Sequence, residues 1–100
     1  MKKLDQIQNE KIKDFCRKWK VLELALFGSI VREDFKKESD VDVLITFEPA
    51  AGWSLYELMD MQDELADIFG RKVDLVEKDG LRNPIRRKAI LNEARIIYAA

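Results

Sequence analysis

The sequence predicts an α/β (α+β) fold, a single domain over residues 1–100 in which helices pack on a small mixed β-sheet. Two observations carry this prediction. Helical and extended apolar patterns alternate along the chain, in the order helix, strand, short helix, strand, helix, strand, helix, strand. In addition, 100 residues with 47% apolar and 37% charged side chains can build one modest core but not two domains.

The first half begins with an amphipathic helix over residues 3–18, because apolar residues recur there at helical spacing. The short, nearly all-apolar run 21–27 is typical of a buried strand. Gly28 and Ser29 then predict a tight turn into a short helical segment, with Ser29 as its candidate N-cap. After a charged loop, the β-branched residues of 41–47 predict a second strand.

The helix with the clearest start and stop signals is predicted after Ser54 and ends before Gly70. Ser54 as N-cap and Glu57 three residues later form a capping box, Trp53 and Leu58 are placed as a hydrophobic staple, and Gly70 stands where a C′ glycine belongs. The residues expected on its buried face are Leu55, Leu58, Met59, Leu65, Ile68 and Phe69.

The last part of the chain contains two more strands and one more helix. Residues 72–76 predict a third strand, and Asn83 with Pro84 marks the N-cap and first turn of a helix. Residues 95–98 predict a final short strand.

Composition excludes several kinds of protein. The 18 Lys and Arg against 19 Asp and Glu give a net charge of −1, which disfavours nucleic acid as the principal ligand. There is no His and the one cysteine, Cys16, lies in an apolar-periodic stretch, so the usual zinc sites and His-based triads are excluded and Cys16 is expected in the core. Any catalysis must therefore rest on carboxylates.

The sequence contains no membrane or export signal that we recognise. The N-terminal residues are charged where a signal peptide needs an apolar run, and no stretch approaches the roughly 20 apolar residues of a membrane span. We therefore expect a cytoplasmic protein.

Three aspartates stand in positions that strands disfavour. Asp40 and Asp42 begin the second strand two residues apart, so their side chains share a face, with Cα atoms about 6.5–7 Å apart. Asp74 lies between Val73 and Leu75 in the next strand. Like charges this close repel each other, and Mg²⁺, which prefers such hard oxygen ligands, would relieve the repulsion. Two such ions can activate an attacking oxygen and stabilise a leaving pyrophosphate.

The turn at Gly28 and Ser29 supplies a complementary feature. Glycine lets backbone N–H groups approach an anion closely, and the hydroxyl can contact phosphate oxygens. Each feature alone is common in loops and strand ends, but a carboxylate cluster combined with an anion-binding turn indicates phosphoryl or nucleotidyl transfer.

The segment from Leu26 to Phe47, LFGSIVREDFKKESDVDVLITF, resembles the signature of the DNA polymerase beta nucleotidyltransferase superfamily: Gly-Ser, ten residues, then Asp-x-Asp. Together with Arg32 and the segment around Asp74, nearly the whole chain resembles the minimal nucleotidyltransferases, which commonly serve as antitoxins of HEPN-domain toxins. The resemblance implies the polymerase beta catalytic-domain-like fold.

The resemblance also implies roles for six residues. Asp40, Asp42 and Asp74 would be catalytic and bind Mg²⁺, with two ions expected, and Gly28, Ser29 and Arg32 would bind the triphosphate of ATP. The chain departs from many relatives, which have Gly-Ser-x-Ala-Arg-Gly, because Val31 and Glu33 replace the alanine and the last glycine. Glu33 places a negative charge near the phosphate turn.

Other residues have two interpretations. Arg32 contacts phosphates or pairs with Asp34 or Glu38. Trp53 and Tyr56 either stack on an adenine or, as we favour, pack in the core. A basic cluster near the last helix, Arg82, Arg86, Arg87 and Lys88, either binds a partner or phosphates or forms an ordinary solvated face, which we favour.

The leading functional hypothesis, implied by the resemblance, is Mg²⁺-dependent transfer of AMP from ATP to a protein hydroxyl, specifically a tyrosine of a cognate HEPN toxin. One alternative is a non-catalytic antitoxin that neutralises its partner by occlusion. Another is a catalytic domain acting on a small-molecule acceptor, which the short chain disfavours. The acceptor, the base specificity, the oligomeric state and the exact role of Asp74 do not follow from the sequence.

Overall fold

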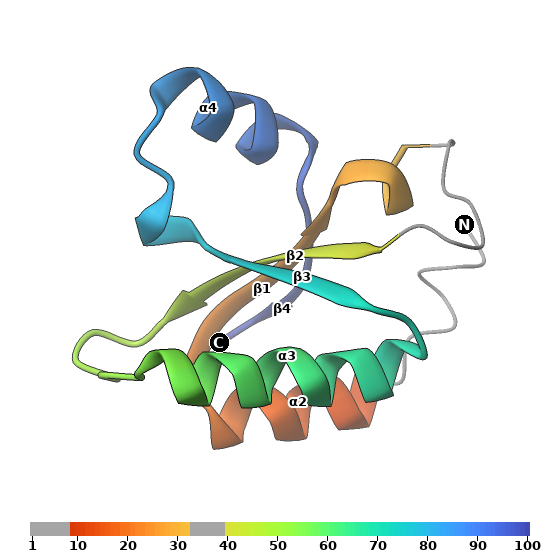
Figure 1. Cartoon of the computed structure of the whole chain (residues 1–100), viewed down its shortest axis with the longest axis vertical. Helices are drawn as coiled ribbons and strands as arrows, with labels where there is room; N and C mark the ends of the chain where they lie inside the picture. Colours follow the sequence, from red (N-terminus) through yellow and green to blue (C-terminus); the bar gives the residue numbers. More distant parts are fainter. Residues whose placement is uncertain (1–8, 33–39) are drawn as a thin grey trace.

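The computed structural model describes residues 9–32 and 40–100. In these parts a mixed sheet lies between two helical layers (Figure 1). The predicted order of elements is confirmed, with one additional short 3₁₀ helix, η2. The elements are α2 (Asn9–Lys18), β1 (Val21–Phe27), η1 (Gly28–Ile30), β2 (Val41–Phe47), α3 (Leu55–Phe69), β3 (Val73–Glu77), η2 (Lys78–Gly80), α4 (Pro84–Glu93) and β4 (Arg95–Ala99).

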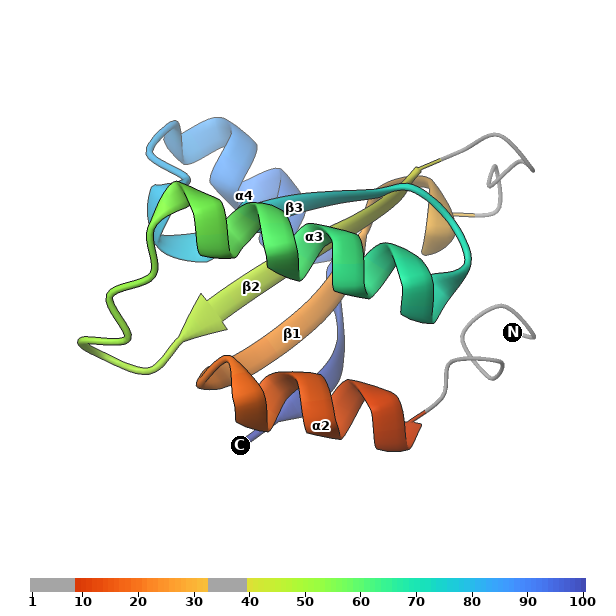
Figure 2. The ribbon, with the colours of Figure 1, turned by 60° about the horizontal axis from the view of Figure 1, so that its bottom comes forward.

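The four strands lie in the order β3-β2-β1-β4. β1 is antiparallel to β2 and to β4, whereas β2 and β3 are parallel. Parallel neighbours need a crossover connection, and α3 provides it. Helices α2 and α3 cover one face of the sheet and α4 covers the other (Figures 1 and 2). The predicted fold class is therefore confirmed.

The main core lies between the sheet and the α2–α3 layer. It includes Cys16, as the sequence predicts, and also Trp19, whose ring meets that of Trp53 edge-on at 5.1 Å between centroids. Trp53 Nε1 also donates a hydrogen bond of 2.8 Å to the Trp19 backbone oxygen, so Trp53 packs against the core, as favoured from the sequence. A smaller apolar cluster lies under α4: Ala25, Phe27, Leu44, Leu81 and Ile90.

The predicted helix caps are present. In α3 the Ser54 N–H and Oγ–H donate to the Glu57 carboxylate at 2.8 and 2.7 Å, and Gly70 has the left-handed φ of 69° that suits a C-cap glycine. These hydrogen bonds lower the pKa of Glu57, beginning with that from the Ser54 backbone. At the start of α4, Asn83 Oδ1 accepts from the N–H groups of the first helical turn.

Several details of the sequence prediction are corrected. The third strand begins and ends one residue later than predicted, and the fourth extends to Ala99. Ser29 is not an N-cap, because η1 begins at Gly28 and Ser29 lies inside it. Residues 3–8 of the predicted first helix lie outside the described residues. None of the helices in the described segments has the length and apolar character needed to cross a membrane.

The buried face of α3 also differs from the prediction. Met61 is fully buried, whereas Met59 and Leu55 are 56% and 70% exposed. Two residues along a helix subtend about 200°, so Met59 and Met61 must lie on opposite sides, and the stripe formed by Leu58, Met61 and Leu65 is the one that meets the sheet. Tyr56 is 78% exposed, so the favoured core position for it is wrong.

Candidate active site

Alternation along β2 places Asp42 on the face of the sheet that α4 covers. Its neighbours Val41 and Val43 are buried on the opposite face, in the main core. Leu44, two residues after Asp42, packs in the cluster under α4. The apolar residues of β2 thus fix its register and leave Asp42 half-buried among polar groups.

Asp74 lies directly beside Asp42, because β2 and β3 pair in register at these two residues. Both flanking residues of Asp74 pack toward the main core, so the Asp74 side chain shares the α4-facing side with Asp42. Asp74 is exposed, and so is Asp40, which immediately precedes β2. The structure therefore brings Asp42 and Asp74 together on the α4 side at one end of the sheet, and Asp40 lies at the same end.

Asp42 lies within the electrostatic influence of the other two aspartates. Burial raises the pKa of Asp42 above its usual value, and the negative charges of Asp74 and then Asp40 raise it further. The Arg32 guanidinium opposes this shift, and Glu93 adds to it. Burial and then the neighbouring negative charges disfavour the anionic form of Asp42, and a bound cation would offset both effects.

Gly28 makes close contact with this cluster. It directly follows the end of β1, where Phe27 pairs with Asp42, and its φ is +75°. A Cβ atom built on Gly28 would overlap the Oδ2 atom of Asp42. Glycine is therefore required here both by the left-handed backbone and by the carboxylate that lies against it.

Arg32 follows the same turn, in which its N–H and that of Val31 donate to the Gly28 oxygen at 3.2 and 3.1 Å. Its guanidinium Nη1 forms an ion pair with Glu93, at 3.2 Å from Oε2. The partners considered from the sequence, Asp34 and Glu38, lie outside the described residues, as does Glu33. Ser29 is half-buried within the turn.

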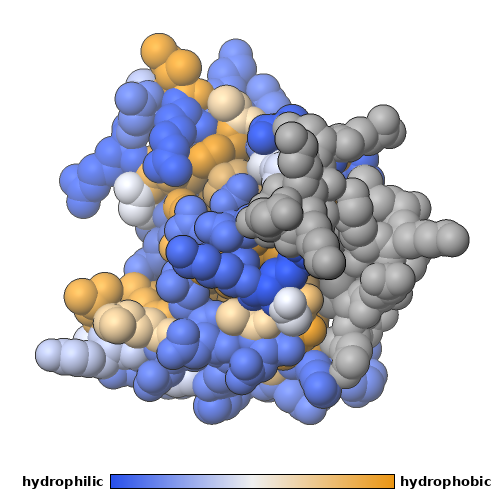
Figure 3. Space-filling model, turned by 45° about the vertical axis from the view of Figure 1, so that its right-hand side comes forward, coloured by the Kyte–Doolittle hydropathy of each residue, from blue (hydrophilic) through white to orange (hydrophobic). Residues whose placement is uncertain are grey.

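Glu93 is the site residue that the sequence analysis missed. It is the last residue of α4, and its Oε1 accepts a hydrogen bond of 2.7 Å from the Gly28 N–H. The one available signal was an acidic residue at a helix C-terminus, where the helix dipole disfavours negative charge. Hydrophilic side chains gather in the middle of the face that Figure 3 shows.

The carboxylates suit Mg²⁺ by their chemistry, since they offer hard oxygen donors from neighbouring strands. In the arrangement described, no three Asp, Glu, His or Cys side chains are close enough together to hold a metal ion. Within residues 9–32 and 40–100, the fit to Mg²⁺ therefore rests on the chemistry of the donors and not on three ligands already gathered around one point.

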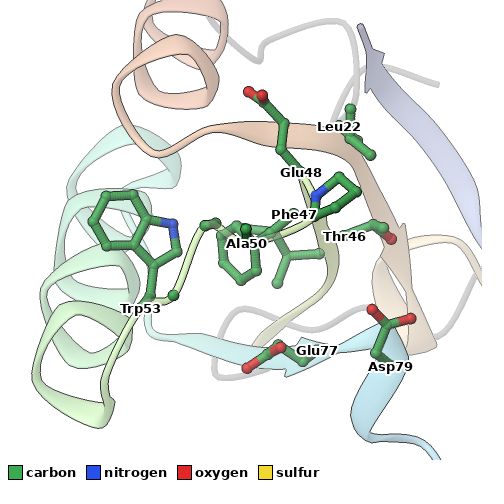
Figure 4. Close-up of a pocket in the computed structure, with 12 residues that line it drawn as sticks. Leu22, Thr46, Phe47, Glu48, Ala50, Trp53, Glu77 and Asp79 are labelled. Carbon is green, nitrogen blue, oxygen red and sulfur yellow. The ribbon is translucent and has the colours of Figure 1, made fainter.

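The other candidate residues lie elsewhere. Arg87 donates to the backbone oxygen of Lys78 at 2.9 Å and so anchors α4 to η2, whereas Arg82, Arg86 and Lys88 are exposed. Trp53 lines a pocket of about 550 Å³ at the carboxyl ends of β2 and β3, whose acidic rim includes Glu77 (Figure 4). The aspartates stand at the amino ends of the same strands, so this pocket is separate from them.

Comparison with known proteins gives a consistent result. A family model described as nucleotidyltransferase domain matches residues 9–97. A protein of Methanocaldococcus jannaschii, MJ1217, whose name proposes a protein adenylyltransferase, is 37% identical over 98% of this chain and 96% of its own length. Protein adenylyltransferase MntA of Thermococcus cleftensis is 33% identical over 98% of this chain and 94% of its own.

Solved structures share the fold. One, described as a proposed minimal nucleotidyltransferase, has a TM-score of 0.71 and 30% identity, and the match covers 87% of this chain and 86% of that one. A toxin–antitoxin with AMP-PNP has a TM-score of 0.74 and 19% identity over 93% of this chain and 74% of its own. A Shewanella oneidensis complex of an MNT antitoxin with a tri-AMPylated HEPN toxin has a TM-score of 0.65 and 18% identity over 92% and 70%.

Proposed function

The chain belongs to the nucleotidyltransferase domain family and is a minimal nucleotidyltransferase, and from this premise we propose that it transfers AMP from ATP to a hydroxyl group of a partner protein. The observation that carries the proposal is the pairing of Asp42 with Asp74 in register, beside Asp40 and against the Gly28 turn. Relatives named as protein adenylyltransferases support a protein acceptor.

Asp40, Asp42 and Asp74 would hold Mg²⁺, which when bound would polarise phosphate oxygens and lower the barrier to attack on the α-phosphate. The three carboxylates would orient the reacting groups along one edge of the sheet. Asp74 is exposed, and it would face the incoming hydroxyl and accept its proton. Gly28, Ser29 and Arg32 would hold the triphosphate tail, since the turn offers an N–H, a hydroxyl and a guanidinium.

The acceptor we propose is a tyrosine of a HEPN-domain toxin, so that the chain acts as the antitoxin of the pair. The neighbouring structure of an MNT antitoxin with a tri-AMPylated HEPN toxin supports this choice. We also propose, as the sequence predicts, that residues 1–100 form a single domain and that the protein is cytoplasmic.

Incubation of the chain with a candidate HEPN toxin, Mg²⁺ and ATP labelled at the α-phosphate tests this function. We expect label on a toxin tyrosine, lost in the Asp40→Ala and Asp42→Ala variants, and neutralisation of the toxin at substoichiometric amounts when ATP is present. No label transfer, with both variants still neutralising the toxin at one-to-one stoichiometry, would instead establish occlusion. Label on a small molecule alone would establish a small-molecule acceptor.

A further inference from the structure

The carboxylate of Glu93 already occupies donors of the proposed triphosphate site. Its Oε1 accepts from the Gly28 N–H at 2.7 Å, and its Oε2 lies 3.2 Å from Arg32 Nη1. A backbone N–H has one hydrogen, so it makes one strong bond at a time. A phosphate oxygen that takes the Gly28 N–H must therefore displace the Glu93 carboxylate from it.

Local preferences do not explain an acid at this position. Glu93 ends α4, where the partial negative charge of the helix disfavours another anion, and the last turn of α4 contains no basic residue. The neighbouring Asp42 is also disfavoured as an anion partly because of Glu93. The contacts with Gly28 and Arg32 offset these costs, so the position of Glu93 depends on the turn.

We propose that Glu93 is an internal competitor of the nucleotide: it binds the Gly28 N–H and Arg32 in the nucleotide-free protein and is displaced by the phosphates. The inference rests on the proposed function, because it takes these donors as the triphosphate site. A carboxylate and a phosphate are both oxygen anions that accept from N–H and guanidinium groups, so one can replace the other at the same donors.

The exchange would have two consequences. Without nucleotide, Glu93 keeps the left-handed turn at Gly28 in the conformation that the phosphates need. When nucleotide binds, the carboxyl end of α4 loses its contact with the turn, and β4 begins only two residues later, at Arg95. Nucleotide occupancy would thus be transmitted to the junction of α4 and β4.

Titration calorimetry on wild type and Glu93→Gln tests the competition. The ligands are inorganic tripolyphosphate and, with Mg²⁺, the α,β-methylene analogue of ATP, whose α–β bridge resists nucleotidyl transfer. We expect Glu93→Gln to bind both about tenfold more tightly, because a neutral amide oxygen competes less well than a carboxylate for a charged donor. Glu93→Ala should show the same direction.

Glu23→Gln is the matched control. Glu23 is also a glutamate with 30% of its side chain exposed and a basic partner, Lys78, at 3.7 Å. It lies five residues before Gly28, about 16 Å along the strand from the turn. It should therefore bind both ligands as the wild type does, which excludes a general effect of removing one negative charge.

Unchanged or weaker binding by Glu93→Gln, or no binding by either protein, would overturn the inference. The Gly28 amide resonance gives a second measurement: it should shift in Glu93→Gln without ligand, and again in the wild type when tripolyphosphate is added. The label-transfer assay is separate. If the wild type transfers label but Glu93→Gln has unchanged affinity, the proposed function stands and this inference is wrong. If Glu93→Gln binds more tightly but no label is transferred, this inference stands and the proposed function is wrong.

Discussion

The two faces of the sheet differ in what they bury. Among the described residues, fourteen buried side chains form the core under α2 and α3, whereas five form the cluster under α4. The α4 side also contains Asp42, Asp74 and Glu93, of which Glu93 contacts the Gly28 turn directly. One face therefore supplies most of the packing energy and the other holds the charged groups, although both draw on the same strands.

The largest effect should come from the polar face. Asp42→Asn should lower the rate of AMP transfer about 10³-fold, because one of the proposed ligands loses its charge. The free energy of unfolding at neutral pH should stay the same or rise, since Asp42 is destabilised as an anion. Transfer rates and urea titrations measure both quantities. Asp63→Asn, at an exposed position of α3, is the control, and a large loss of stability in Asp42→Asn would contradict the separation of the faces.

The next effect concerns the apolar face. Leu65→Ala should lower the free energy of unfolding by about 2–5 kcal/mol, because Leu65 is fully buried in the main core. Leu55→Ala in the same helix should cost well under 1 kcal/mol at a site that is 70% exposed. Transfer activity measured below the unfolding temperature should survive in both variants. If folded Leu65→Ala lost activity as Asp42→Asn does, the two faces would not be independent.

A substitution at Gly28 has two costs, the strain of a left-handed backbone and the crowding against Asp42. Gly70 allows the two to be separated, because only the backbone strain applies there. Both glycines have positive φ, 75° and 69°, but a Cβ on Gly70 would meet nothing within 4 Å, whereas one on Gly28 would overlap Asp42. We expect Gly70→Ala to cost about 1 kcal/mol for backbone strain alone, and Gly28→Ala about 1–3 kcal/mol more for the crowding. Equal costs in thermal or urea unfolding would mean that Asp42 moves aside freely.

The pH dependence of the free energy of unfolding reports on the polar face alone, through the titration of Asp42. The pKa of Asp42 is raised above 3.8 in the folded protein, so the folded state binds the proton more tightly than the unfolded state. Stability must then fall as pH rises from about 4 through the folded pKa. Asp42→Asn removes this term, so its stability advantage over the wild type should be present at neutral pH and disappear below pH 4. An advantage that persists at pH 3 would point to another cause.

The slowest reaction is expected for the Cys16 thiol, which is buried in the main core on the apolar face. Burial raises the pKa of Cys16 to about 12, and only 1% of the residue is exposed. At pH 8 the native protein should therefore react very slowly with iodoacetamide, while the urea-unfolded protein reacts fully. Mass spectrometry of the alkylated chain measures this difference. Rapid modification of the native protein would show that α2 opens readily from the sheet.

The sequence predicts the elements better than the contacts between them. Caps, turn glycines and apolar periodicity are local signals, so α3 and its Ser54–Glu57 capping box follow directly from neighbouring residues. Asp42 and Asp74 could also be identified, because charged residues in apolar strands contradict the local preference, and Asp40 immediately precedes the first of these strands. The assignment of catalytic and ligand roles to them stays a prediction.

The contacts that could not be predicted join residues that are far apart along the chain. Glu93 and Gly28 are 65 residues apart, and nothing local to either one specifies their hydrogen bond. The same holds for Arg32 and its partner. Ser29 shows a different limit. The turn signal was correct, but the short helix starts at Gly28 and not after Ser29, a difference of two residues that composition does not resolve.

The in-register pairing of Asp42 with Asp74 also constrains how this chain can vary over evolutionary time. Because side chains alternate with a period of two, a slip of one residue between β2 and β3 would place Leu75 beside Asp42 and turn Asp74 toward the main core. The apolar residues that both strands bury in the main core set that alignment, so a residue inserted or deleted within either strand would turn Asp42 or Asp74 to the opposite face. Substitutions can retune this site gradually, whereas length changes within the two strands should be rare among functional descendants.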